Sequence, residues 1–257
     1  MRVSQHGDMP VTTSGSRCGA KNMTTPCTTG DTADTLPRGV LFGLPVALVT
    51  QTQAVERIRA HIARRPVEPN ARQDVWQGVW QVVTLNPEIA MRARRDGELR
   101  AIILRAGLVV ADGVGVTLAL RLRGYRAPER VTGVDLVEAL AAGAASNGWR
   151  MFLLGAQPGV AEAAGAALVQ RHPGLIVAGI CAGSPQPQDD AETLARIRAA
   201  QTDILCVAYG SPAQERWIAR QRRQLDGIVA LGVGGAFDFL AGRVPRAPVW
   251  MRRMGVE

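Results

Sequence analysis

From Val40 onward, short apolar runs alternate with longer stretches of helical periodicity. The runs Leu108–Ala111 and Ile204–Val207 are apolar throughout, which is typical of strands buried on both faces of a parallel sheet. The helical stretches between such runs are long enough to act as crossover connections between parallel strands. The pattern therefore predicts an α/β chain folded as a Rossmann-like α/β/α sandwich with a mostly parallel sheet.

The expected elements follow from the apolar runs, the turn residues and the helix-start signals. The expected strands are Val40–Val49, Val79–Thr84, Leu108–Ala111, Arg150–Leu154, Leu175–Cys181, Ile204–Val207 and Ile228–Gly232. The expected helices run from an N-cap at Thr50 through Arg64, from Pro87, near Val114–Arg123, after Asp135, and over Val160–Arg171, Glu192–Ala200 and Ala213–Arg223. Two prolines break the pattern in Arg65–Arg72.

Residues 1–38 differ in composition from the rest of the chain. They are rich in Ser, Thr, Gly and Pro and show no periodicity, so we predict a disordered tail followed by one domain over 39–257. The tail has no apolar segment of the kind that a secretory signal needs. No apolar run in the chain reaches the roughly 18 to 20 residues of a membrane-spanning helix.

The formal net charge of +8 would suit an anionic partner. Lys21 is the only lysine, however, so the basicity reflects a general use of arginine, and aromatic residues make up only 4% of the chain. A base-stacking surface for nucleic acid is therefore not expected. The four cysteines have neither metal-ligand nor disulfide-framework spacing, and we expect free thiols in a reducing, cytoplasmic setting.

Glycine-containing polar clusters follow several of the expected strands. In parallel α/β sheets ligands bind at the carboxyl ends of the strands, and glycine lets backbone N–H groups approach a phosphate there. For any single cluster taken alone, a tight strand-to-helix turn is the more common explanation, because glycine is frequent in α/β turns. None of the clusters is a GxGxxG fingerprint or a Gly-Lys-Ser/Thr loop. The clusters are 84–86, 112–115, 155–159, 210–215 and 232–238.

Three side chains in or near these clusters are candidates for chemistry, and each has a structural alternative. Asp112 could present an open carboxylate or could cap the following helix. Arg130 could clamp a phosphate or could form a surface ion pair with Glu129 or Asp135. Gln214 could bind a sugar hydroxyl or could lie in a solvated first helical turn.

In this order, the clusters resemble the WecG/TagA/CpsF family of glycosyltransferases, and the resemblance covers residues 39–257. Seven pieces in register make the resemblance specific. The matching pieces are Thr84-x-Asn86, Asp112–Gly113-x-Gly115, Glu129–Arg130–Val131-x-Gly133-x-Asp135, Leu154–Gly155-x-x-Pro158–Gly159, Gly210-x-Pro212-x-Gln214–Glu215, Gly234–Gly235-x-Phe237–Asp238-x-x-x-Gly242 and Arg246–Ala247–Pro248.

The resemblance implies an enzyme that transfers a sugar from a UDP-sugar donor to an undecaprenyl-diphosphate-linked saccharide. The sugar implied is N-acetylmannosamine, its uronic acid or glucuronic acid, and the setting is cell-surface polysaccharide synthesis at the inner face of the bacterial plasma membrane. The residues implied to line the active pocket are Thr84, Asp112, Arg130 and Gln214, with Asp112 as the general base. A homo-oligomer is compatible with the resemblance.

Two departures from the family pattern stand out. Ala213 occupies a position where family members commonly have lysine, and the chain stops at Glu257, where family members continue into an arginine-rich tail. In the family that tail helps to complete the active site and contacts the membrane. We therefore expect membrane contact to depend on a segment that this sequence lacks, and activity to be affected.

The sequence has no Asp-x-Asp motif, which many glycosyltransferases use to hold a metal at the donor diphosphate. Arginines are the alternative source of positive charge, because their planar forks bind phosphate in bidentate fashion. We therefore predict metal-independent chemistry without a cofactor, supported by Arg130, Arg243 and Arg246, with Arg252 and Arg253 near the end of the chain. The substrate-binding candidates are Asn86, Gly113, Gly155, Gly210, Glu215, Gly234, Gly235, Asp238, Arg243 and Arg246.

Asp238 could bind the nucleotide, although a role in locking its glycine-rich turn is slightly favoured. Trp217 and Trp250 are expected to pack rather than to bind sugar. Two competing functions remain at this point. A sugar-nucleotide oxidoreductase or epimerase is disfavoured by the missing GxGxxG and Tyr-x-x-x-Lys motifs. An inactive membrane-associated regulator would retain the fold without its tail.

Overall fold

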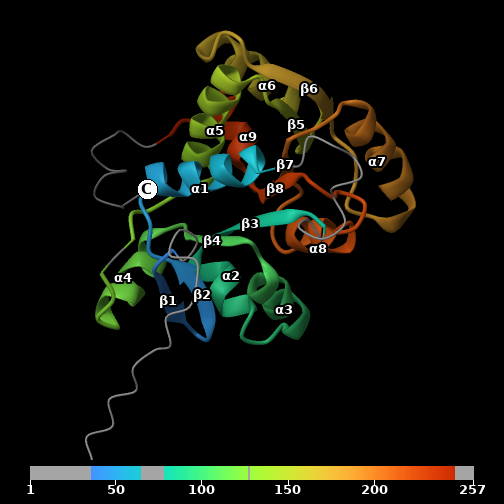
Figure 1. Cartoon of the computed structure of the whole chain (residues 1–257). Helices are drawn as coiled ribbons and strands as arrows, with labels where there is room; N and C mark the ends of the chain where they lie inside the picture. The colour runs from blue at the N-terminus through green and yellow to red at the C-terminus, as the bar shows by residue number, and fades with distance from the viewer. Residues whose placement is uncertain (1–35, 65–77, 127, 247–257) are drawn as a thin grey trace, which may run out of the picture. The chain divides into compact units, whose positions relative to one another are not determined.

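The computed structural model describes residues 36–64, 78–126 and 128–246, and its centre is a six-stranded sheet (Figure 1). The strand order is β4-β3-β8-β7-β5-β6, and every neighbouring pair is parallel. This arrangement confirms the predicted Rossmann-like sandwich. The strands are β3 (Trp80–Leu85), β4 (Leu108–Ala111), β5 (Arg150–Gly155), β6 (Ile176–Cys181), β7 (Ile204–Ala208) and β8 (Val229–Gly232).

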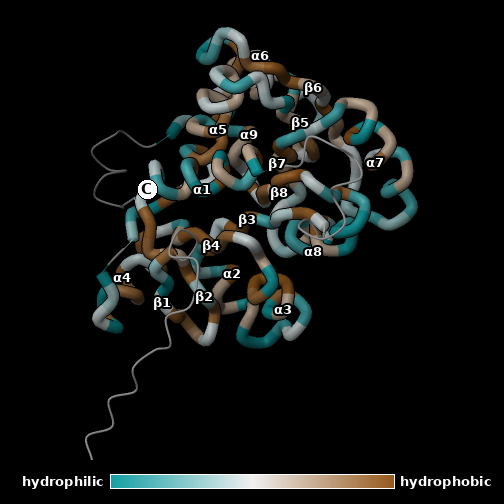
Figure 2. Tube along the Cα trace, viewed as in Figure 1, coloured by the Kyte–Doolittle hydropathy of each residue, from teal (hydrophilic) through white to brown (hydrophobic). Residues whose placement is uncertain are grey.

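Helices cover both faces of the sheet because successive strand residues point to opposite sides. Val82 packs with the helices of one face, and its neighbour Val83 packs with those of the other. Apolar residues accordingly run through the strands in Figure 2. The first face carries α1 (Gln51–Ala63), α5 (Gly133–Asn147), α6 (Val160–Arg171) and α9 (Ala236–Leu240). The second carries α2 (Pro87–Arg92), α3 (Gly97–Arg105), α4 (Val114–Leu122), α7 (Asp190–Ala199) and α8 (Ala213–Arg220).

The single strand predicted over Val40–Val49 is wrong. The segment is an antiparallel hairpin of β1 (Arg38–Leu41) and β2 (Leu44–Ala47). Phe42 and Gly43 turn the chain with φ angles of 51° and 74°, as two-residue hairpin turns require. The apolar run concealed this turn because both strands of the hairpin pack against α2, α3 and α4.

The folded part begins earlier than the predicted boundary at residue 39, since Leu36 packs against the core and β1 starts at Arg38. The rest of the predicted tail, residues 1–35, and the predicted break over Arg65–Arg72 lie outside the described residues. Within the described ranges, no helix combines the length and apolar character needed to cross a bilayer.

Capping residues and a proline determine where the helices α1 and α2 begin. The Thr50 hydroxyl accepts from the Gln53 N–H at 3.2 Å, and α1 begins at Gln51, which confirms the predicted cap. Pro87 is the first residue of α2, also as predicted. The helices α3 and α9 were not predicted. At the carboxyl ends of the four adjacent strands β4, β3, β8 and β7, the chain in each case enters a short polar turn before the next helix.

Candidate active site

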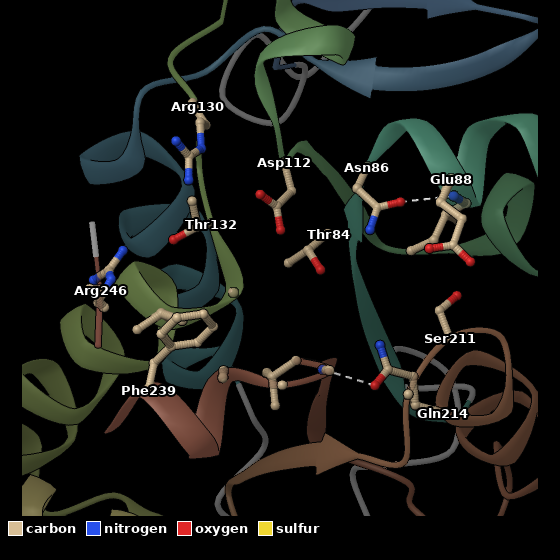
Figure 3. Close-up of a pocket in the computed structure, with 18 residues that line it drawn as sticks. Thr84, Asn86, Glu88, Asp112, Arg130, Thr132, Ser211, Gln214, Phe239 and Arg246 are labelled. Atoms are coloured by element: carbon tan, nitrogen blue, oxygen red, sulfur yellow. Dashed lines mark hydrogen bonds between the residues drawn. The ribbon is translucent and has the colours of Figure 1, made fainter. Parts of the chain in front are cut away.

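A cavity of about 400 Å³ lies at the carboxyl ends of these four strands (Figure 3). Its walls come from the turns after β3, β4, β7 and β8, from the segment leading into α5, and from the chain after α9. The lining residues are Thr84, Asn86, Glu88, Ile89, Asp112, Arg130, Thr132, Gly133, Val134, Gly210, Ser211, Gln214, Val233, Gly234, Gly235, Ala236, Phe239 and Arg246. All four predicted catalytic residues are therefore brought together.

Thr84 and Asn86 present polar atoms from the end of β3. The Thr84 hydroxyl donates to the carbonyl oxygen of Gly232 on the neighbouring strand β8, at 3.2 Å. Asn86 is the N-cap of α2, and its Oδ1 accepts from the Ile89 N–H at 2.8 Å. Because the cap engages the Asn86 oxygen, its amide nitrogen faces the cavity (Figure 3).

Asp112 directly follows β4, and its side chain is half-buried in the cavity wall. Its main-chain N–H donates to the Leu85 carbonyl at 2.9 Å, which extends the strand pairing by one residue. The N-cap of α4 is Gly113, with φ at 90° and no capping side chain. Helix capping, the alternative role considered for Asp112, is therefore wrong, and the carboxylate is turned toward the cavity (Figure 3).

Two arginines line the cavity across from Gln214 (Figure 3). Arg130 comes from the extended segment before α5, and Arg246 from the chain after α9. The Arg246 guanidinium donates to Asp135 Oδ1 at 2.7 Å, and the Thr132 hydroxyl donates to Asp135 Oδ2 at 2.7 Å. Asp135 therefore orients Arg246 through an ion pair, which partly offsets the positive charge of Arg246 at the cavity wall.

Gln214 lies in the first turn of α8, but it is buried, with only 2% of its surface exposed. The solvated first turn considered for it is wrong. Its Oε1 accepts from the Gly234 N–H at 3.0 Å, and its Nε2 donates to Glu215 Oε1 at 2.8 Å. Both ends of the amide are thus fixed, and the side chain joins the β7 turn to the β8 turn.

Glu215 lies behind Gln214 rather than in the cavity wall, and only 1% of its surface is exposed. Burial raises the pKa of its carboxyl group, and the hydrogen bond from Gln214 opposes that rise only in part. Glu215, predicted as a binding residue, therefore reaches the cavity through the Gln214 amide.

The glycines of the predicted site fall into two groups, and the first faces open space. Gly210 and Gly234 have φ angles of 75° and 53°, and a Cβ placed on either would meet no atom within 4 Å. Both line the cavity, as does Gly235. Their conformations suit glycine, and without a Cβ they leave the cavity open beside the backbone, while the Gly234 N–H itself donates to Gln214.

In the second group, close packing against other parts of the protein requires glycine. Gly155 has φ at 99°, and a Cβ there would lie 2.7 Å from the carbonyl carbon of Ala208 on β7. A Cβ on Gly113 would lie 3.2 Å from the ring of Pro87. Neither Gly155 nor Gly113 lines the cavity, so we assign their small size to contacts within the protein.

Asp238 and Arg243 also lie outside the cavity lining. The Asp238 carbonyl oxygen accepts from the Arg243 N–H at 3.0 Å and closes the turn after α9. The Arg243 guanidinium lies beside Gly159. Trp217 is fully buried and donates to Asp190 at 2.9 Å, which confirms packing. The predicted contributions of Trp250, Arg252 and Arg253 and the Ala247–Pro248 piece lie outside the described residues.

The cavity contains residues that the sequence reasoning missed. Ser211 stands between two motif positions, and Glu88 follows Pro87 in the first turn of α2, so both were close to recognised signals. Thr132 is the N-cap of α5 and lies inside the motif that supplied Arg130. Phe239 forms an apolar wall from α9, a helix that was itself not predicted.

No cluster of three or more His, Cys, Asp or Glu side chains that could hold a metal ion occurs within the described ranges. Two carboxylates, Asp112 and Glu88, and two guanidinium groups, Arg130 and Arg246, are the charged groups in the described cavity wall. Cys181 and Cys206, in the same described part of the chain, are free thiols, and burial raises the pKa of Cys206 to about 12.

A parallel α/β/α sheet with a polar cavity at its carboxyl edge, lined by two carboxylates and two arginines, is the arrangement of an α/β enzyme. Comparison with known proteins specifies the class. The chain belongs to the Glycosyl transferase WecG/TagA/CpsF family, whose profile matches residues 40–257. It is a glycosyltransferase, and the oxidoreductase and epimerase alternatives are set aside.

Two relatives carry the same name, N-acetylglucosaminyldiphosphoundecaprenol N-acetyl-beta-D-mannosaminyltransferase. The protein from Bacillus subtilis (strain 168) is 33% identical over 176 residues, which cover 68% of this chain and 68% of the relative. The protein from Staphylococcus aureus (strain NCTC 8325) is 34% identical over 220 residues, which cover 84% of this chain and 81% of the relative.

Proposed function

We propose that this glycosyltransferase moves a sugar from a UDP-sugar to an undecaprenyl-diphosphate-linked saccharide, with inversion at the anomeric carbon. The names of the two relatives support the acceptor, since both describe transfer of an N-acetyl-mannosaminyl group to N-acetylglucosaminyldiphosphoundecaprenol. N-acetylmannosamine is the first donor sugar to test, followed by its uronic acid and glucuronic acid. The product would enter cell-envelope polysaccharide synthesis.

The observation that carries this proposal is the position of Asp112 in one cavity with Arg130 and Gln214. Inverting transfer needs one base on the acceptor side and a means of stabilising the leaving group. Asp112 supplies the carboxylate, and the arginine side of the cavity supplies positive charge. Thr84 and Asn86 lie beside Asp112 and can bind sugar hydroxyl groups (Figure 3).

In the proposed reaction the acceptor hydroxyl attacks the anomeric carbon as its proton passes to Asp112. The bond from that carbon to the UDP oxygen breaks, and its electron pair leaves with the diphosphate. Arg130 and Arg246 neutralise the charge that develops there, while N–H groups of the turns at Gly210 and Gly235 bind phosphate oxygens. This arrangement is proposed to work without a metal ion.

The test is an initial-rate assay of the full chain with UDP-N-acetylmannosamine and a short-chain lipid-diphosphate N-acetylglucosamine. Release of UDP must equal formation of the disaccharide, and proton NMR of the product reports the anomeric configuration. Parallel reactions with the two uronic acid donors assign the sugar. UDP release without disaccharide, or retention of the donor configuration, would contradict the proposal.

A further inference from the structure

Helix α4 has an exposed apolar face in addition to the face that packs into the core. Val116 and Leu120 are buried against the hairpin and the sheet. Val114, Leu118 and Leu122 are exposed, with 36%, 50% and 81% of their surfaces accessible. These three residues, spaced four apart, form one line along the helix, which we name the α4 stripe.

The end of α4 is strongly basic. Arg121, Arg123 and Arg126 are all exposed, and no acidic residue occurs between Asp112 and Glu129. The Arg123 guanidinium donates to the Val40 carbonyl at 3.4 Å, which places one of these cations beside β1. Exposed leucines combined with nearby cations are the surface chemistry of a segment that lies on an anionic bilayer.

The stripe is also joined directly to the cavity. Helix α4 begins at Val114, two residues after Asp112, and Figure 1 shows it at the edge of the fold beside β1. At 1.5 Å per residue, Leu122 lies about 12 Å along the helix from Val114. A lipid-linked acceptor whose diphosphate lies at the bilayer surface would then have its sugar within reach of Asp112.

We propose that the α4 stripe, with Arg121, Arg123 and Arg126, contacts the anionic surface of a lipid bilayer, independently of the C-terminal segment to which the family resemblance assigns membrane contact. The acceptor chemistry in this step rests on the proposed function, whereas the surface chemistry rests on the exposure and charge of α4 itself. The occupant is a bilayer because the patch combines three exposed apolar side chains with three exposed arginines, in a stretch of sequence that has no acidic residue between Asp112 and Glu129. A second copy of the chain would bring two groups of arginines together at this patch.

The test is vesicle flotation of the full chain with phosphatidylcholine vesicles containing phosphatidylglycerol. Wild type should float with these vesicles, and binding should weaken as salt is raised or phosphatidylglycerol is removed. The double variant Leu118→Asn and Leu122→Asn should lose about tenfold or more in vesicle affinity, because two apolar side chains leave the interface. Each Arg→Gln change at 121, 123 or 126 should cost about fivefold.

The matched control is the double variant Leu104→Asn and Val169→Asn, which removes two side chains that are 49% and 42% exposed on α3 and α6. It should bind vesicles like wild type, and melting curves should show that both double variants fold. Equal vesicle binding by the stripe variant and the control would overturn the proposal. So would a stripe variant that changes only from dimer to monomer in light scattering.

Turnover separates this inference from the proposed function. The stripe variant should keep wild-type activity on a water-soluble short-chain acceptor and lose activity on the same head group embedded in vesicles. If wild type binds vesicles through the stripe but turns over neither acceptor, the surface assignment stands and the proposed reaction fails. If the stripe variant keeps full activity on embedded acceptor, the surface assignment fails and the reaction stands.

Discussion

Asp112 is the residue at which chemistry and structure can be separated most cleanly. Asp112→Asn keeps the size and hydrogen-bonding capacity of the side chain but removes its ability to accept a proton. Loss of a well-placed general base costs about 10²- to 10⁴-fold in rate, so kcat should fall by that factor. UDP-sugar affinity should change little, since the transferred proton belongs to the acceptor.

The melting temperature provides the control for Asp112→Asn. Gly113, and not Asp112, is the N-cap of α4, and asparagine keeps the size and hydrogen-bonding capacity of the aspartate, so the substitution should leave thermal stability near wild type. A variant that retains more than about a third of wild-type turnover would remove Asp112 from the role of base.

Glu215 gives a prediction on pH. Its pKa is raised in the folded protein above the ordinary value of 4.5, because burial penalises the charged form. Between those two pKa values the folded chain holds a proton that the unfolded chain has lost. The contribution of Glu215 to stability is therefore complete below the unfolded pKa and is lost as pH rises through the folded pKa.

Glu215→Gln should remove this pH dependence while keeping an oxygen that can accept from Gln214. The free energy of unfolding of the variant should therefore improve relative to wild type as pH is raised from about 4.5 toward neutrality. Urea denaturation of both proteins at several pH values measures the difference. A difference that is constant with pH, or that moves in favour of wild type, would contradict the assignment.

At the scale of elements, the two groups of glycines predict opposite outcomes. Gly155→Ala forces a Cβ to within 2.7 Å of the β7 backbone at a positive φ, so it should destabilise the fold by roughly 1 to 3 kcal/mol or more. Its KM for UDP-sugar, measured on folded enzyme, should stay near wild type. The measurements are urea unfolding and initial rates.

Gly234→Ala is the matched comparison. Its Cβ meets no protein atom within 4 Å, so the stability cost should be limited to about 1 kcal/mol for the left-handed backbone. Gly234 lines the cavity and donates to Gln214, so KM for the donor should rise several-fold. If Gly234→Ala were the less stable variant and Gly155→Ala the one with the raised KM, the donor would bind outside this cavity.

Elements with strong local signals were predicted from sequence, and those that depend on distant contacts were not. The strand Leu108–Ala111 and the helix Val160–Arg171 match their predicted bounds because apolar runs and helical periodicity mark them. The hairpin was missed because its turn at Phe42 and Gly43 lies inside an apolar run. The packing role of Gly155 depends on β5 lying next to β7, which follows from the order of strands in the sheet and not from local sequence.

The same distinction between local signals and distant contacts holds for the residues of the site. Thr84, Asp112 and Gln214 were predicted together because they match the motifs of the family and follow strands whose carboxyl ends meet at one edge of a parallel sheet, and the structure places all three in one cavity. The burial of Glu215 behind Gln214 could not be read from its position in the first turn of α8. It depends on the fit between the β7 and β8 turns, which are joined through Gly234.

At the scale of the whole molecule, the cavity is assembled from turns that together span more than one hundred residues of the chain. Thr84 and Gly232 illustrate this, since one hydrogen bond joins the end of β3 to the end of β8. Positive charge reaches the cavity in the same way, from Arg130 before α5 and Arg246 after α9. In the proposed reaction, the positive charge at the donor diphosphate would thus come from side chains of two separate segments.

This distribution of charge leads to the prediction that UDP binds without a divalent ion. Calorimetric titration of UDP into the full chain should give the same affinity in EDTA as in Mg²⁺ or Mn²⁺, within about twofold. Arg130→Gln and Arg246→Gln should each weaken binding by about tenfold, because a charge-assisted hydrogen bond to phosphate is worth about 1.5 to 3 kcal/mol.

Arg243→Gln is the control, since Arg243 lies outside the cavity lining and its substitution should leave UDP affinity unchanged. Binding that disappears in EDTA and returns with Mn²⁺ would contradict the arginine assignment. Equal losses in all three variants would show that general positive charge, rather than the two cavity arginines, attracts the nucleotide.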